Sequence, residues 1–133
     1  MPIELQYLIS AAGLYLFMII VQAAIATLSG KATLSELVGP RDDMPAGGVT
    51  VFHGRAKRAQ ANFTEGMVMF IPLCLVAVYS NETSSLTALG AILFFYGRLA
   101  YTPLYYFGVP WLRTVAWAVS IIGILLFFVE LLT

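Results

Sequence analysis

Hydrophobic and polar positions occur in long blocks along this chain. Four mostly apolar stretches are separated by short polar segments. A helix of about 20 apolar residues is long enough to cross the ~30 Å hydrocarbon core of a bilayer. The pattern therefore predicts an all-α membrane protein in which a single domain, residues 1–133, forms a bundle of four transmembrane helices. The expected spans are residues 5–28, 51–80, 85–106 and 111–131.

The segments between the stretches have the composition of turns. Residues 30–48 are rich in Gly, Pro and Asp, and residues 81–84 read Asn-Glu-Thr-Ser, in which a hydroxyl can cap the next helix. Pro110 suits a first helical turn, whereas Pro103 is expected to kink or end the third helix.

Composition agrees with a membrane protein and excludes several other classes. The chain is 60% hydrophobic and 11% charged, with a formal net charge of zero. It has no basic tract, so nucleic acid is not an expected partner. One His, one Cys and scattered carboxylates match no metal-ligand spacing, and the chain has no Gly-rich phosphate loop.

The basic residues predict an orientation in the membrane. In the four-span reading every Lys and Arg falls at or near the first and third loops, and the opposite side has only acidic residues. The positive-inside rule then places these loops in the cytoplasm and both termini outside. The basic residues are Lys31, Arg41, Arg55, Lys57, Arg58, Arg98 and Arg113.

A polar stripe marks the second expected helix. Arg55, Arg58, Asn62 and Glu65 fall within an arc of about 80° at 100° per residue. Ionisable side chains cost roughly 2.5–3.5 kcal/mol at the centre of a membrane and therefore tend to mark functional sites. The stripe suits a small ligand that is mostly anionic and carries an amine. Snorkelling to the headgroups would explain the cations, but Asn62 and Glu65 lie deeper.

Two further groups lie at a similar depth. Arg98, Tyr101 and Tyr105 share one face of the third helix, and Arg113 begins the fourth. Counted from the outer turns at 1.5 Å per residue, Glu65, Arg98 and Arg113 all lie about 21–25 Å inward. The alternatives are an aromatic belt with a snorkelling arginine, and a simple topology anchor at Arg113. His53 lies about 160° from Arg55 and is expected on the surface.

These residues resemble the signature of the MAPEG superfamily, membrane-associated proteins of eicosanoid and glutathione metabolism that include the microsomal glutathione transferases. The resemblance covers nearly the whole chain, and the first loop looks like that of bacterial members. It is carried by Arg58-Ala59-Gln60-x-Asn62-x-x-Glu65 preceded by Arg55, by Arg98-Leu99-x-Tyr101-x-x-x-Tyr105, by Arg113, and by Gly39-Pro40-Arg41-Asp42 in the loop.

The resemblance implies a homotrimer with sites between neighbouring subunits that open to the cytoplasmic leaflet. It implies glutathione as cosubstrate, a second, lipophilic substrate that arrives through the membrane, and Arg113 as the catalytic residue that stabilises the thiolate. The residues expected to bind glutathione, from the resemblance and the polar stripes together, are Arg55, Arg58, Gln60, Asn62, Glu65, Arg98, Tyr101 and Tyr105.

The chain departs from the family pattern at a few positions. Other members carry an arginine late in the first helix, where Gln22 stands here, and an aromatic residue often follows the signature glutamate, where this chain has Gly66. The segment between Tyr105 and Arg113 is about one residue longer and contains Pro110. These differences weaken the expectation of strong transferase activity more than the expectation of the fold.

The favoured function is a glutathione-dependent transferase or peroxidase of the bacterial inner membrane that acts on lipophilic electrophiles or lipid hydroperoxides. One alternative is a non-catalytic lipid-binding or scaffolding protein of the same fold. Another is a small transport or channel subunit, but a transport path needs polar groups at every depth and the outer halves of these spans are apolar.

Overall fold

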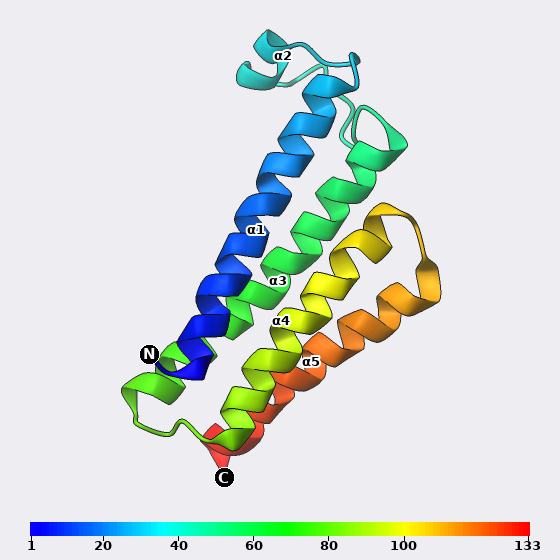
Figure 1. The fold of residues 1–133 in the computed structure, drawn as a ribbon. Coiled ribbons are helices and arrows are strands. Elements are labelled where there is room, and N and C mark those ends of the chain that lie inside the picture. The colour runs from blue at the N-terminus through cyan, green and yellow to red at the C-terminus, as the bar shows by residue number, and fades with distance from the viewer.

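The computed structural model describes residues 1–133 and contains helices and no strands. Four long helices lie side by side, and a short helix stands at one end of the bundle (Figure 1). The all-helical class predicted from the sequence is thus confirmed. The helices are α1 (Ile3–Leu28), α2 (Leu34–Val38), α3 (Val51–Tyr79), α4 (Ser85–Tyr106) and α5 (Pro110–Leu132).

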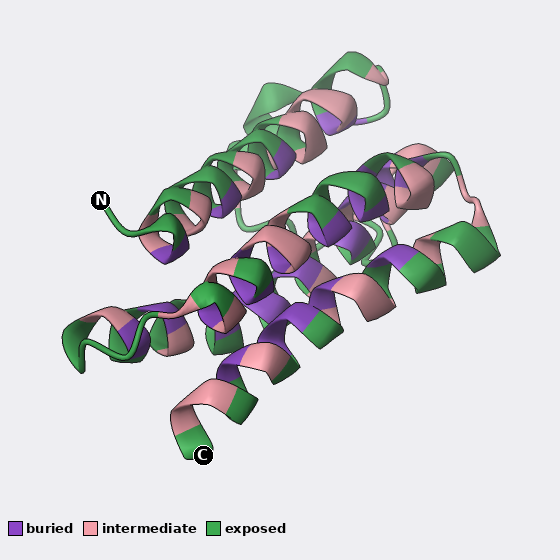
Figure 2. Ribbon diagram, turned by 60° about the horizontal axis from the view of Figure 1, so that its bottom comes forward, coloured by how far each residue is buried: buried purple, intermediate pink, exposed green.

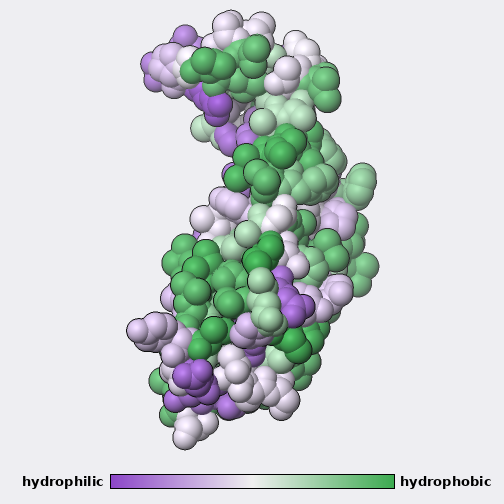
Figure 3. All heavy atoms as spheres, turned by 60° about the vertical axis from the view of Figure 1, so that its left-hand side comes forward, coloured by the Kyte–Doolittle hydropathy of each residue, from purple (hydrophilic) through white to green (hydrophobic).

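Successive long helices run in opposite directions, so the polar segments gather at the two ends of the bundle. The loop around α2 and the turn between α4 and α5 lie at one end, and the two termini lie at the other (Figure 1). In Figure 3 hydrophilic residues gather at both ends, and hydrophobic residues cover much of the surface between them.

Three of the long helices, α1, α3 and α5, are long and apolar enough to cross a membrane. The chain is therefore an integral membrane protein. Helix α4 has 22 residues but does not reach the same hydropathy, because it contains Arg98 and several tyrosines. It packs most extensively against α5 and also contacts α1 and α3.

Local capping explains where the helices begin. Thr50 accepts a hydrogen bond from the backbone N–H of His53 and starts α3, while Ser84 and Thr87 form a capping box at the start of α4. Pro110 occupies the first turn of α5. The first loop contains more structure than its turn composition predicted, because Thr33 caps the short helix α2.

The core of the bundle is a column of phenylalanines. Phe70 stacks on Phe94 with ring centroids 4.0 Å apart and meets Phe127 edge-on at 5.9 Å. Phe63 continues the column toward the loop end and stacks on Tyr15 of α1 at 5.6 Å. Buried residues lie on the faces that the helices turn to one another (Figure 2).

Helices α4 and α5 approach so closely that their glycines are required. A Cβ added at Gly97 would lie 2.8 Å from the backbone nitrogen of Ser120 and 2.9 Å from the carbonyl oxygen of Ala116. A Cβ at Gly90 would lie 2.7 Å from the carbonyl oxygen of Gly123. Because these neighbours are backbone atoms, any larger residue would push the two helices apart.

Helix α1 is attached by a narrow buried stripe and by several polar contacts with α3 and α4. Its buried residues are Glu4, Ala11, Met18 and Ala26, about one every two turns. At the end that holds the termini, the carboxylate of Glu4 is 2% exposed and accepts a hydrogen bond from the hydroxyl of Thr87 on α4. The N-terminus of α4 also carries a partial positive charge, which stabilises the nearby carboxylate of Glu4.

The expectation that His53 is a surface residue was wrong. Its imidazole is 3% exposed, because α1 and the end of the first loop cover it. Nδ1 accepts a hydrogen bond of 3.0 Å from the backbone N–H of Val49, and Nε2 lies 2.9 Å from the carboxamide nitrogen of Gln22 on α1. His53 therefore links α1, the loop and α3.

Replacing Gly97 with Ala should destabilise the protein by about 1–3 kcal/mol, because the added methyl group would force α4 and α5 apart. Gly13→Ala is the matched control, since a Cβ there meets nothing within 4 Å. Thermal unfolding in detergent compares the two variants. Equal stability of Gly97→Ala and Gly13→Ala would contradict the close packing of α4 on α5.

Replacing His53 with Ala should release the end of the first loop. Loss of the hydrogen bond from Val49 should speed exchange of that amide about five- to tenfold, which corresponds to ~1 kcal/mol of local stability. Hydrogen exchange of peptides covering residues 45–52 measures this change. His53→Asn, whose side-chain oxygen can take the place of Nδ1, should retain most of the protection; equal loss in both variants would count against the assigned bond.

Candidate functional site

The residues of the polar stripe on α3 contact different neighbours. The guanidinium of Arg55 donates a hydrogen bond of 3.4 Å to the carbonyl oxygen of Tyr106 and packs over Gly108. Arg55 therefore caps the C-terminal end of α4, where a cation is favourable. One turn further along α3, Nε of Arg58 donates to the hydroxyl of Tyr105 at 3.3 Å. Glu65 is exposed on the surface of the protomer.

Arg98 lies inside the bundle. It is 1% exposed, and Nη1 donates a hydrogen bond of 2.6 Å to Oδ1 of Asn62. Its guanidinium lies 5.3 Å from the ring centroid of Tyr101 and 5.8 Å from those of Phe63 and Phe94. Contacts with aromatic faces offset part of the cost of burying a cation.

Arg113 on α5 completes the arrangement. Its guanidinium carbon lies 4.6 Å from the ring centroid of Tyr105, whose ring also contacts Tyr101 at 5.5 Å. One aromatic ring is thus in contact with the arginine of α5 on its face and with Arg58 of α3 through its hydroxyl. Three helices therefore converge on Tyr105.

A small open pocket of about 210 Å³ lies at this convergence. Residues of α3, α4 and α5 line it. Four of the residues predicted from the sequence line it, together with two residues of α5 that sequence reasoning missed. The spacing of Arg113 and Trp117 by one helical turn was the available signal. The lining is Asn62, Tyr101, Tyr105, Arg113, Thr114 and Trp117.

Gln60 belongs to a different face of α3. It is two positions, about 200°, away from Asn62, and lines a second polar pocket beside α1 together with Gln22, Lys57 and Thr64. Its Oε1 atom is buried without a hydrogen-bond partner. Within one protomer, Gln60 is therefore not brought to the pocket that contains Asn62 and Arg113.

The predicted binding residues accordingly fall into three groups. Asn62, Tyr101 and Tyr105 line the pocket with Arg113. Arg58 and Arg98 lie outside its lining and act on it through hydrogen bonds to Tyr105 and Asn62. The remaining three do not line the pocket: Arg55 lies at the end of α4 and Gln60 beside α1, while the exposed Glu65 is close enough to Arg98 and Tyr101 to interact with them electrostatically.

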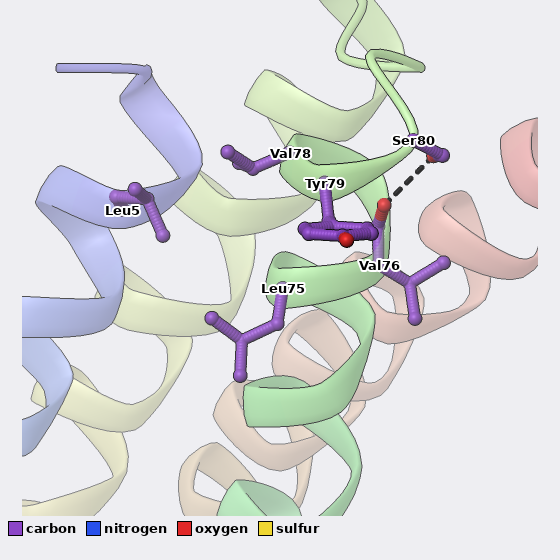
Figure 4. Close-up of a pocket in the computed structure, with 6 residues that line it drawn as sticks. All are labelled: Leu5, Leu75, Val76, Val78, Tyr79 and Ser80. Atoms are coloured by element: carbon purple, nitrogen blue, oxygen red, sulfur yellow. Dashed lines mark hydrogen bonds between the residues drawn. The ribbon is translucent and has the colours of Figure 1, made fainter.

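An apolar groove lies at the opposite end of the bundle and is chemically different. Its volume is about 520 Å³, and it is lined by Leu5 of α1 and by the last turns of α3 (Figure 4). Its one drawn hydrogen bond, from the Ser80 hydroxyl to the Val76 carbonyl oxygen at 2.7 Å, satisfies groups of α3 itself. The groove has no charged residue, so it lacks the cations that an anionic ligand would need.

Chemically, the pocket near Tyr105 is suited to an anion. Arg113 contributes a charged donor, and the neighbouring Arg58 and Arg98 add positive potential. The hydroxyls of Tyr101 and Tyr105 and the carboxamide of Asn62 can donate hydrogen bonds. No group of three or more His, Cys, Asp or Glu residues lies close enough together to hold a metal ion.

Comparison with known proteins places the chain in a family. The model of the MAPEG family matches residues 7–133, which is essentially the whole chain. No curated protein and no solved structure matches the chain. The family match contains every residue of the pocket, the whole of α3, α4 and α5 and all but the first turn of α1, and it confirms the resemblance seen in the sequence. The chain belongs to the MAPEG family, membrane proteins of eicosanoid and glutathione metabolism.

Proposed function

We propose that the protein is a glutathione-dependent membrane transferase or peroxidase that acts on lipophilic electrophiles or lipid hydroperoxides. The observation that carries the proposal is the pocket at Tyr105, where Arg113, Asn62 and two tyrosines meet. Glutathione has two carboxylates that suit these donors and an ammonium group that suits Glu65. The pocket is open, and in this proposal an apolar second substrate reaches it through the bilayer.

The proposed role of Arg113 is to stabilise the thiolate of glutathione. A nearby cation favours the charged form of a thiol, and the thiolate is the reactive nucleophile. In conjugation the thiol proton leaves to water, the sulfur forms a bond to the electrophilic carbon, and the electron pair of the broken bond leaves with the leaving group. In this proposal Asn62 and Tyr105 hold the tripeptide, which lowers the entropic cost of the encounter.

The membrane arrangement is part of the proposal. Helix α4, 22 residues or about 33 Å long, lies beside the three apolar spans and would be the fourth. The loop around α2 and the α4–α5 turn lie at the same end as most basic residues, which supports a cytoplasmic location for that end and an external location for both termini. The bacterial-type loop at Gly39-Pro40-Arg41-Asp42 supports the bacterial inner membrane.

A homotrimer would explain why the predicted binding residues are divided. Gln60 faces the α1 side of the protomer and Asn62 faces α4 and α5, so no single protomer unites them. In a closed ring with head-to-tail contacts, the α1 side of one subunit can lie against the α4–α5 side of the next. The Oε1 atom of Gln60 is buried and has no hydrogen-bond partner. A ligand or a second subunit at that face would supply one.

Replacing Arg113 with Ala should abolish the ultraviolet absorbance of bound thiolate, while glutathione still binds through Asn62 and Tyr105. The turnover of a model electrophile should fall about 100-fold, the loss typical of one electrostatic contact to the reacting atom. Lys31→Ala is the control, since Lys31 lies in the first loop. Unchanged thiolate absorbance in Arg113→Ala would refute this role, and wild-type binding without any turnover would favour a lipid-binding member of the family.

Mixed oligomers should test the subunit arrangement. Gln60→Ala and Asn62→Ala subunits should each bind glutathione weakly alone. Coexpressed with different tags and purified as mixed trimers, they should regain about one third of the wild-type sites, because one interface in each mixed ring joins two unaltered faces. Native mass measurement should report three subunits. A monomer, or no recovery in mixed rings, would contradict the trimer with shared sites.

A further inference from the structure

Asn62 and Arg98 form a pair beneath the pocket. The Asn62 side chain lines the pocket, whereas the guanidinium of Arg98 lies behind it and is almost completely buried. The hydrogen bond of 2.6 Å to Asn62 is the one hydrogen bond that this guanidinium makes, and its Nε atom is buried without a partner.

The chemistry of the pair fixes the orientation of the amide. A guanidinium has five N–H donors and no acceptor, so the group of Asn62 that faces Arg98 must be its oxygen. The amide nitrogen of Asn62, with its two N–H donors, then points away from Arg98. Because Asn62 lines the pocket, these donors are presented to whatever occupies it.

We propose that Arg98 is a positioning residue, which holds the Asn62 carboxamide so that its N–H donors bind a carboxylate of the ligand. The inference rests on the proposed function and identifies the ligand group that meets Asn62. Arg98 itself does not line the pocket, so it acts through Asn62 and not by direct contact with the ligand.

Charge supports the same assignment. Arg98 has aromatic rings on several sides, and the carboxylate of Glu65 attracts it electrostatically but makes no hydrogen bond to it, so its positive charge is only partly compensated in the protomer. A buried cation of this kind favours an anion nearby. A carboxylate that accepts hydrogen bonds from Asn62 would supply the missing negative charge through one intervening amide.

Gly66 provides the space that this position of Arg98 needs. A Cβ at residue 66 would lie 2.9 Å from Nη2 of Arg98 and 3.2 Å from Cε2 of Phe94. The aromatic residue that often follows the signature glutamate in this family could not stand there with Arg98 in its present place. Gly66 and the buried Arg98 are therefore parts of one local arrangement.

Tyr105 is oriented by the same principle on the other side of the pocket. Its hydroxyl oxygen accepts a hydrogen bond from Nε of Arg58, which leaves its own proton free to donate. Arginines outside the pocket lining thus turn both Asn62 and Tyr105 into donors, which fits an acceptor such as a carboxylate.

Equilibrium binding of reduced glutathione to the full-length protein in detergent tests the assignment. Asn62→Asp keeps an acceptor for Arg98 but removes both N–H donors and should weaken binding about tenfold or more. Arg98→Met frees the Asn62 amide and should also weaken binding, and Arg98→Lys, which retains a donor, should restore most of it. When Asn62 is already replaced with Ala, adding Arg98→Met should not weaken glutathione binding any further.

Two controls separate positioning from loss of structure. Asn81→Asp makes the same chemical change in an exposed turn at the far end of the bundle, and Thr102→Val removes a buried hydrogen bond of α4 to the Arg98 carbonyl oxygen. Both should bind glutathione as the wild type does.

The outcomes separate this inference from the proposed function. Wild-type affinity in Asn62→Asp, or a further loss when Arg98→Met is added to Asn62→Ala, would overturn the positioning role while the proposed function stands. No glutathione binding by the wild type at millimolar concentration would overturn the proposed function and this inference with it.

Discussion

The burial of one guanidinium inside a membrane-spanning bundle is the constraint on which the site depends. Arg98 is 1% exposed, and a cation at such a place is costly unless its surroundings accommodate it. Aromatic rings, the oxygen of Asn62 and the space left by Gly66 do so here. Helices α3 and α4 are thereby held in one register, and that register brings Asn62 next to Tyr101 and Tyr105.

The close packing of α4 on α5 adds the third helix to this register. Glycines at their contact let the backbones meet, so Arg113 at the start of α5 reaches the ring of Tyr105. Helix α1 is attached differently, through one narrow stripe, Glu4 and the His53–Gln22 contact. Close contacts between helices thus surround the pocket, while a second polar pocket lies between α1 and α3.

Much of this could be predicted because it depends on local pattern and helical spacing. The apolar blocks indicated a helical membrane protein, and the Arg58–Glu65 string with Arg98 and Arg113 indicated the family; both predictions are confirmed. The burial of a residue by residues far away in the sequence could not be predicted. His53 is covered because Gln22, 31 residues earlier, lies against it, and nothing in its own helix signals that contact. Trp117 follows Arg113 by one helical turn, which signals a shared face, but only the packing of α4 on α5 shows that this face lines the pocket.

A structure of the protein in lipid bilayers with bound glutathione tests the central claim most directly. The account predicts a trimer in which the tripeptide lies between subunits, with its sulfur near Arg113, a carboxylate at the amide nitrogen of Asn62, and Gln60 of the neighbouring subunit closing the site. Glutathione bound elsewhere, or Asn62 and Arg113 facing lipid with no ligand between them, would contradict it.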